Sequence, residues 1–489
     1  MLWKGLDRLA GLAKHIIIAA AIGLSAQLDI FYMALALLGV LVFSWATMID
    51  VVAVPSMVKA WQEGRRDEFK RIASGLFSYV LAGSVLLALI LYLGKDHMAQ
   101  VAIGFEAEQR QLLAEAIPWL LPVIILYIPL RLMGAVLRAI RQFSTFYQAE
   151  FLTALTVLVC VALFREDGHV LLWSLSVGVT SAFLYLLHKS RHFVFPLGNP
   201  FSDSVRQSLQ LAPGLLVLQG AQYIFVLTDR IFVSYLPTGG ISAVAYAMTI
   251  VSLLPGVISL SGSFITVIAE QDTVEGRGKR LNALLSMGIF IALGATCFML
   301  LAGPAMVQVL LERGMFSAAD TQLVATGIFA YAWMVLPLFL IGPLDQIFQV
   351  ERRIGFMVRR TALGMVANIV LNAWFLFGLG WGLFGIALAT SISYWIMLSA
   401  GLHGLKKLGY HIDWARHLKW AGWVLIFLAP TYIMSSFVPV SLTHGLPNLL
   451  VNVCAVVCVL LIAGLTYPGE ESVSVRKTLH RCLDKAMKS

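Results

Sequence analysis

Two adjacent charged residues, Asp229 and Arg230, interrupt an apolar run that reads "YIFVLTDRIFVSYLPTGG" and ends in a Pro-Gly turn. The run resembles the outer half of a membrane-spanning helix. Charge inside such a helix is costly, so it usually marks a water-filled path or a binding site. We therefore expect Asp229 to serve a site within the membrane, with Arg230 facing a wet cavity or pairing with a neighbouring carboxylate.

A second set of polar residues lies in two later apolar runs. Asn368 and Asn372 are four residues apart and share one helix face, and Thr390 lies within "GIALATSIS". Judged by their positions along the apolar runs, Asn372, Thr390 and Asp229 all lie in the half nearer the outer face of the membrane. One carboxylate, two amide oxygens and a hydroxyl suit a hard cation, and a single carboxylate favours a monovalent ion such as Na⁺. Ordinary hydrogen bonding between helices is the alternative.

Basic residues gather in the first apolar run, "LDRLAGLAKHIIIAAAIG". Arg8 and His15 share a helix face, and Lys14 lies near Arg8. Lys14 is nearly two turns further into the run, which favours a cavity, whereas Arg8 could reach the inner headgroups by snorkelling. Asp29 opens the second run. Further ionisable residues within the runs are Asp50, Glu115, Arg131 and Asp345.

The familiar catalytic patterns are absent from the sequence. It contains no Gly-rich phosphate loop, no zinc-type His/Glu spacing and no Ser-His-Asp candidate. The five cysteines have no metal-binding spacing, and we interpret them as packing residues. These patterns give no support for an enzyme, and we expect no cofactor other than a candidate coupling ion, Na⁺.

The elements that hold these residues are membrane helices. The chain has 489 residues, of which 59% are hydrophobic and only 12% charged. Apolar runs of about 20 residues recur, each long enough to cross the hydrocarbon core, and they are too long for barrel strands. This predicts an all-α polytopic membrane protein. The fourteen predicted spans are 8–26, 29–58, 72–94, 112–138, 148–164, 169–188, 211–235, 240–269, 281–303, 321–350, 360–378, 382–403, 418–438 and 447–466.

The distribution of Lys and Arg predicts the orientation. Most of the 35 lie at the termini or in the even-numbered connections, such as the group Arg65, Arg66, Lys70 and Arg71. The odd-numbered connections hold only Lys95, Arg110, Arg165 and Arg313. The positive-inside rule then places both termini in the cytoplasm. The net charge of +9 is explained by this distribution and does not indicate a nucleic-acid partner.

Two polar loops show an internal repeat. "GFEAEQRQLL", which starts at Gly104, matches "GMFSAADTQL", which starts at Gly314, and Phe105 and Phe316 are separated by 211 residues. Because six helices return the chain to the same side, the repeat is parallel, and such halves hold substrate at their interface. We expect an N-lobe at 1–195, a C-lobe at 196–405, and two extra helices with a basic tail at 406–489.

The chain resembles the MurJ/MviN family of lipid II flippases, in the multidrug/oligosaccharidyl-lipid/polysaccharide exporter superfamily. The resemblance rests on "DRLAGLAKHIIIAAAIG", "LDIFYMAL", "TDRIFVSYLPTGGISAVAYAMTIVSLLPGVI", "LLERGMFSAADTQLVATGIFAY" and "GLFGIALATSIS". It implies two lobes around a central cavity and alternating access. It also implies that Asp229, Asn368, Asn372 and Thr390 match the family's sodium site, with Asn372 where an aspartate can stand.

The chain departs from the family pattern at two pairs of residues. Val42 and Phe43 replace an arginine pair of the second helix, and Met248 and Thr249 replace an acidic-arginine pair of the eighth. In the family those arginines belong to the cavity that holds the pyrophosphate. Arginine binds phosphate bidentately, which Val, Phe, Met and Thr cannot do. The departures favour a related polyprenyl-diphosphate-linked sugar, such as an exopolysaccharide repeat unit, over lipid II itself.

The resulting hypothesis is a flippase of the bacterial inner membrane that moves a lipid-linked oligosaccharide. Arg8 and Lys14 would attract the diphosphate, and Asp29 would bind sugar or act in gating. The expected partners are the lipid-linked glycan, membrane lipids and polysaccharide-assembly enzymes, with the chain acting as a monomer. One alternative is a drug/cation antiporter of the same superfamily, favoured by a cavity rich in aromatic residues. Another is a polysaccharide polymerase or ligase, which the short outer loops disfavour.

Overall fold

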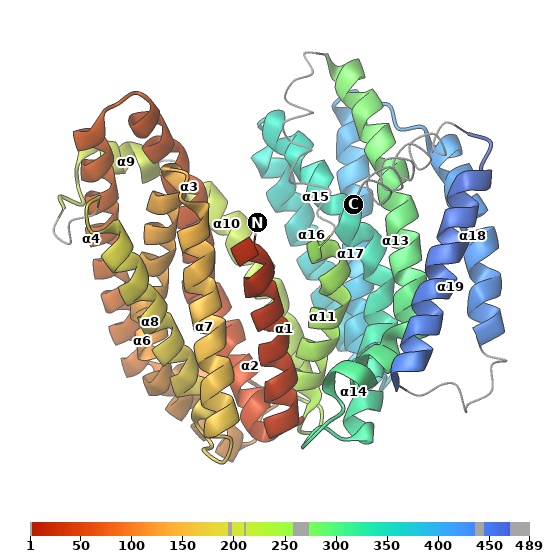
Figure 1. Ribbon diagram of the computed structural model, residues 1–489, viewed down its shortest axis with the longest axis horizontal. Coiled ribbons are helices and arrows are strands. Elements are labelled where there is room, and N and C mark those ends of the chain that lie inside the picture. Colours follow the sequence, from red (N-terminus) through yellow and green to blue (C-terminus); the bar gives the residue numbers. More distant parts are fainter. Residues whose placement is uncertain (1, 194–197, 210–211, 258–272, 436–444, 470–489) are drawn as a thin grey trace. The chain divides into compact units, whose positions relative to one another are not determined.

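The computed structural model describes residues 2–193, 198–209, 212–257, 273–435 and 445–469 (Figure 1). Throughout these ranges the regular structure is helical, which confirms the predicted all-α class. The chain forms two compact units. Unit 1 contains Met1–Ser242 and Leu311–Asp320, and unit 2 contains Ala243–Leu310 and Thr321–Ser489.

Unit 1 is built around the long helix α6, which packs against α3, α4 and α8, while α7 packs against α1 and α8. A π-helical turn at Gly39–Phe43 joins α2 to α3, so these two helices form one continuous stretch. The short helices α5 and α9 lie in connections where the sequence predicted none. The helices of unit 1 are α1 (Leu2–Ile22), α2 (Ala26–Leu38), α3 (Ser44–Gln62), α4 (Arg66–Leu93), α5 (Lys95–Ala99), α6 (Ala107–Ala139), α7 (Phe143–Leu163), α8 (Val170–Ser190), α9 (Asp203–Leu209) and α10 (Ala212–Val233).

Unit 2 holds the remaining helices, among which α17 packs against α15 and α16. A 3₁₀ turn at Ala332–Met334 joins α14 to α15, and a π turn at Trp374–Gly378 ends α16. The helices are α11 (Gly240–Val257), α13 (Val274–Leu311), α14 (Ala318–Tyr331), α15 (Val335–Val350), α16 (Ile354–Ala373), α17 (Gly382–Lys407), α18 (Trp414–Ser435) and α19 (Gly445–Thr466).

Each predicted span overlaps a helix or a continuous series of helices. Within the described ranges, ten helical stretches are long and apolar enough to cross a membrane. The count of fourteen therefore stays a prediction. The second half of the predicted span 240–269, the end of the span 418–438 and the basic tail lie outside the described residues.

The helix α10 lies in the predicted C-lobe, which starts at residue 196, but in the structure it groups with the helices of unit 1. α10 packs along α2, α3 and the π turn that joins them, and so it belongs to unit 1. Gly39 permits this packing, because a Cβ atom there would lie 2.8 Å from Cδ1 of Tyr223. The lobe boundary itself was inferred from the repeat and stays a prediction.

The two repeated loops make matching contacts within unit 1. The amide of Gly104 donates to Oγ of Ser234 at 3.0 Å, just after the end of α10. The amide of Met315, next to Gly314, donates to the carbonyl of Ala20 at 2.8 Å, near the end of α1. The helices α1 and α10 start about one repeat length apart. The loop of the first repeat thus contacts α10, which begins the second repeat, and the loop of the second repeat contacts α1, which begins the first. A twofold repeat has such reciprocal contacts.

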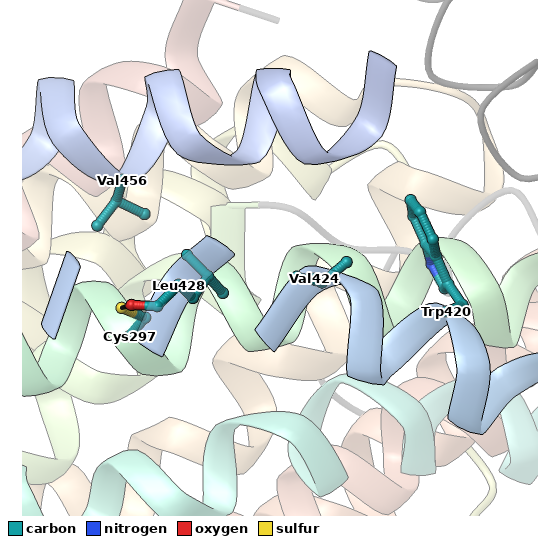
Figure 2. Packing of buried hydrophobic residues seen from close by; sticks show 5 residues of the cluster. All are labelled: Cys297, Trp420, Val424, Leu428 and Val456. Atoms are coloured by element: carbon teal, nitrogen blue, oxygen red, sulfur yellow. Dashed lines mark hydrogen bonds between the residues drawn. The ribbon is translucent and has the colours of Figure 1, made fainter. Parts of the chain in front are cut away.

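The helix pair α18–α19 is held on α13 by a small apolar cluster. Its buried members are Cys297, Trp420, Val424, Leu428 and Val456, and Figure 2 shows them on three neighbouring helices. The thiol of Cys297 approaches the Leu428 carbonyl at 3.9 Å, consistent with a packing role for this cysteine. The indole of Trp420 donates to the Ser286 carbonyl at 2.9 Å. The two extra helices are therefore an integral part of unit 2.

The orientation can be tested at the connection before α14. Ser317 accepts from the amide of Asp320 and so caps that helix, whereas the neighbouring Met315 side chain is 68% exposed. We expect Met315→Cys, in a variant without the native cysteines, to react with an impermeant thiol reagent in intact spheroplasts. A cysteine at Lys279, in a connection predicted to be cytoplasmic, is the matched control and should react only after lysis. The reverse pattern would overturn the orientation.

Candidate functional site

Asp29 holds the turn between α10 and the first residues of α11. Its carboxylate accepts from the amide of Gly239 at 2.6 Å, the amide of Ser242 at 2.7 Å and the hydroxyl of Ser242 at 2.6 Å. The residue is 3% exposed, so these bonds replace water. Gly239 has a φ of +94°, which favours glycine and lets its amide point at the carboxylate.

Arg230, near the end of α10, also hydrogen-bonds to this turn. Its guanidinium Nη1 donates to the carbonyl of Ile241 at 2.7 Å, and the residue is 8% exposed. Asp229, directly before it, is 6% exposed. The two charges that interrupt the apolar run are thus both buried in unit 1. Arg230 bonds a backbone carbonyl and also interacts electrostatically with the carboxylate of Asp29, in line with the predicted carboxylate partner.

A second charged cluster lies further along the bundle, where α1, α6 and α7 meet. Nη1 of Arg131 lies 3.2 Å from Oε1 of Glu150. Glu150 also interacts electrostatically with Lys14. The Arg131 and Glu150 side chains keep 21% and 29% of their surface exposed. Lys14 also interacts with the carboxylate of Asp7, which interacts in turn with Arg8, so this cluster contains the cations Arg8, Lys14 and Arg131 and the carboxylates Asp7 and Glu150.

The predicted substrate-binding residues Arg8, Lys14 and Asp29 do not form one cluster. Arg8 is exposed in the first half of α1, and Lys14 lies beside the Arg131–Glu150 pair. Asp29 follows the other end of α1, whose last residue is roughly 12 Å from Lys14 along the helix axis. The predicted roles of Arg8 and Lys14 in attracting the diphosphate, and of Asp29 in binding sugar or gating, stay predictions.

The polar residues of α16 and α17 come together in unit 2. Nδ2 of Asn368 donates to Oγ1 of Thr390 at 3.2 Å, and Nδ2 of Asn372 donates to Oδ1 of Asn368 at 3.1 Å. All three residues are at most 1% exposed. Three of the four predicted cation ligands are therefore neighbours. Oγ1 of Thr390 and Oδ1 of Asn368 each accept a hydrogen bond within this group, as the alternative of ordinary hydrogen bonding expects. The fourth, Asp229, belongs to unit 1.

Aromatic rings occupy the place where the family pattern has an arginine pair. Val42 is fully buried in the π turn after α2. The ring of Phe43 lies 4.8 Å from that of Tyr127 and 6.4 Å from that of Tyr223, measured between centroids. In the second pair that departs from the family pattern, Met248 and Thr249, the hydroxyl of Thr249 donates to the Ala245 carbonyl four residues earlier. Phe43 thus packs with Tyr127 and Tyr223 in an aromatic cluster at the position of the family's arginine pair.

Glu150 and Ser242 are the site residues that sequence reasoning did not single out. Glu150 lies near the start of a predicted span, so its carboxylate could have been marked as an intramembrane charge. Ser242 carries no such signal, because a serine after a Gly-Gly turn is common in any protein. Its role emerges only from its hydrogen bonds with Asp29, 213 residues away in the sequence.

Comparisons with known proteins agree on one family. The family model described as lipid II flippase MurJ matches residues 18–462. A probable lipid II flippase MurJ of Rhizobium tropici is 24% identical over 429 residues, covering 83% of this chain and 80% of the relative. One of Thermotoga maritima is 22% identical over 398 residues, covering 79% and 80%.

The solved structures show the same fold. A structure of lipid II flippase MurJ in an inward closed conformation aligns with a TM-score of 0.81 at 18% identity, covering 95% of this chain and 97% of that one. An inward-facing transporter of the multidrug resistance MATE family, in the MOP superfamily, aligns at a TM-score of 0.64 and 14% identity, covering 82% and 95%. With the family model spanning nearly all of the predicted helices, the chain belongs to the lipid II flippase MurJ family.

Proposed function

We propose that this protein is a flippase that moves a polyprenyl-diphosphate-linked glycan across the bacterial inner membrane, and not an enzyme. Family membership is the observation that carries this proposal. The cluster of Arg8, Lys14 and Arg131 with Asp7 and Glu150 supports it, because three cations and two carboxylates leave a net positive charge for a diphosphate. The headgroup would enter a cavity by alternating access while the polyprenyl tail stays in lipid.

We infer further that the substrate is a glycan other than lipid II, such as an exopolysaccharide repeat unit. Phe43 with its two tyrosine neighbours replaces cations that would bind pyrophosphate. Aromatic rings pack on the apolar faces of sugars, and they add no phosphate affinity. A larger share of the binding would then come from the sugar and a smaller share from the diphosphate.

Growth rescue tests the choice of substrate. Cells depleted of their own lipid II flippase should not resume growth when this protein is expressed, because Val42 and Phe43 stand where the family has an arginine pair. Membrane levels of the protein should be measured by blotting, and the cells' own flippase supplied from a plasmid is the positive control. Robust rescue would restore lipid II as the substrate.

The aromatic cluster also favours a second candidate, a drug/cation antiporter. Aromatic faces attract organic cations, typically by about 0.5–2 kcal/mol for each contact. This candidate predicts that expression lowers the accumulation of a lipophilic fluorescent cation in cells that lack their major exporters. Replacing Phe43 by Leu should then abolish the difference. Unchanged accumulation in the parent would exclude the antiporter.

The coupling ion that we propose is Na⁺, with Asn368, Asn372 and Thr390 of unit 2 as its ligands. The fourth predicted ligand, Asp229, belongs to unit 1, and its part in the site stays a prediction from the sequence. Bound Na⁺ would supply a positive charge that stabilises one conformational state over another. At a hundred times its dissociation constant, the ion would stabilise the purified protein by about 2.7 kcal/mol, which is visible as a shift in melting temperature.

Variants of the ligands test the sodium site. Thr390→Ala removes one of these oxygen ligands, so we expect the Na⁺-dependent shift to shrink. Asp229→Asn tests the sequence prediction that this carboxylate contributes to the shift. Arg131→Ala, in unit 1, should keep the shift. Melting curves in NaCl and KCl at equal ionic strength make the measurement. If the parent melts at the same temperature in both salts, these residues do not bind Na⁺.

A further inference from the structure

A basic pocket lies at the end of α17 that the charge distribution places in the cytoplasm. Its volume is about 430 Å³, and it lies entirely within unit 2. The polar side chains that line it include Ser399, His403, Lys406 and His411, and no carboxylate is among its lining residues in the described ranges. A cavity with this lining favours an anion. It shares no residue with the proposed glycan or sodium sites.

The loop that closes the pocket is held in place by its neighbours. The carbonyl of His411 accepts from Nδ2 of Asn282 at 2.8 Å, and the amide of Asp413 donates to Oδ1 of Asn282 at 3.1 Å. The hydroxyl of Tyr410 donates to Oε1 of Glu351 at 2.6 Å. Burial and this carboxylate raise the pKa of Tyr410 to about 12, so the hydroxyl remains a donor. The pocket is therefore preorganised.

An apolar stripe leads from the pocket along α17. Trp395, Ser399, Leu402 and Lys406 are spaced by four, three and four residues, so they share one helix face. Trp395 is 40% exposed, and Trp414 at the mouth of the pocket is 49% exposed. From Trp395 to Lys406 the helix rises by roughly 16 Å, about the depth of one leaflet of the hydrocarbon core. This face suits a molecule with an anionic head and an acyl chain.

We propose that this pocket binds the headgroup of an acidic phospholipid from the cytoplasmic leaflet. The phosphodiester lies against Lys406 and the two histidines, and an acyl chain follows the stripe from Leu402 to Trp395. Trp414 is placed at headgroup level, where tryptophan is enriched in membrane proteins. Basic pockets on the cytoplasmic side of membrane proteins suit lipids with this charge. Free phosphate has the same chemistry at the head but gains nothing from the stripe.

Lys406 and Lys407 provide a matched pair for the test. Both are exposed at the end of α17, but only Lys406 lines the pocket. With the full-length protein in a neutral detergent, we expect Lys406→Gln to weaken phosphatidylglycerol binding about fivefold, measured by native mass spectrometry. Lys407→Gln should change it less than twofold. Melting temperatures without added lipid verify that both variants fold.

Two further ligands distinguish a lipid headgroup from free phosphate as the occupant of the pocket. Phosphatidylcholine should bind at least fivefold more weakly than phosphatidylglycerol, and inorganic phosphate at millimolar concentration should not displace the lipid. The proposal is overturned if both lysine variants lose binding equally, because the attraction would then be a general property of the basic surface. Displacement of the lipid by inorganic phosphate would also overturn it, since the pocket would then be a simple anion site.

Discussion

Replacing Asp29 by Ala is expected to abolish glycan transport and to lower the melting temperature of the purified protein. The substitution leaves the buried backbone amides of Gly239 and Ser242 without their acceptor, while the Ser242 hydroxyl keeps the Gly239 carbonyl at 3.2 Å. Each unsatisfied group costs about 1–3 kcal/mol, so the α10–α11 turn would lose its defined position. Transport is measured as the appearance of labelled lipid-linked glycan on the outer face of spheroplasts.

Substitutions of graded severity distinguish the loss of the Asp29 hydrogen bonds from a general loss of stability. Asp29→Asn keeps an acceptor oxygen but loses the charge, so its defect should be smaller than that of Asp29→Ala. Ser242→Ala removes one of the three bonds and should have the mildest effect. Gln27→Ala, in the first turn of the same helix, should behave like the parent. A fully active and stable Asp29→Ala variant would show that the carboxylate is dispensable.

Breaking the ion pair between Asp345 and Arg360 is expected to destabilise unit 2 by about 3–5 kcal/mol. Nη2 of Arg360 lies 2.8 Å from Oδ1 and 3.0 Å from Oδ2 of Asp345, and the Arg360 side chain is only 2% exposed. Asp345→Ala would leave the guanidinium buried without its counter-charge. The loss should appear as a large drop in melting temperature in detergent.

The double variant distinguishes this charge effect from lost packing. Asp345→Leu combined with Arg360→Met removes both charges at similar volume and should restore most of the stability. The pair Lys279–Glu275 is the matched control, because its side chains are 77% and 79% exposed. Glu275→Ala should therefore leave the melting temperature unchanged. A double variant as unstable as Asp345→Ala would contradict the charge argument.

The all-α class of this protein followed from the sequence because the bilayer imposes it. A backbone in lipid must satisfy its own hydrogen bonds, so apolar runs of about 20 residues have few alternatives to a helix. The repeat was readable because its matching parts, such as Gly104 and Gly314, lie in polar loops. Both glycines also meet close backbone contacts: a Cβ atom on Gly314 would lie 2.2 Å from the carbonyl oxygen of Ala20.

The pairing of the charges was decided by the tertiary structure. Arg360 counts as one more cytoplasmic cation in the sequence, yet it is buried against Asp345. Glu150 joins Arg131, and Asp29 reaches a turn more than 200 residues away. Periodicity shows which residues share a face of one helix, but the rotation of one helix against the next determines which faces meet. The partners of a buried charge depend on that rotation, and so does the role that the charge serves.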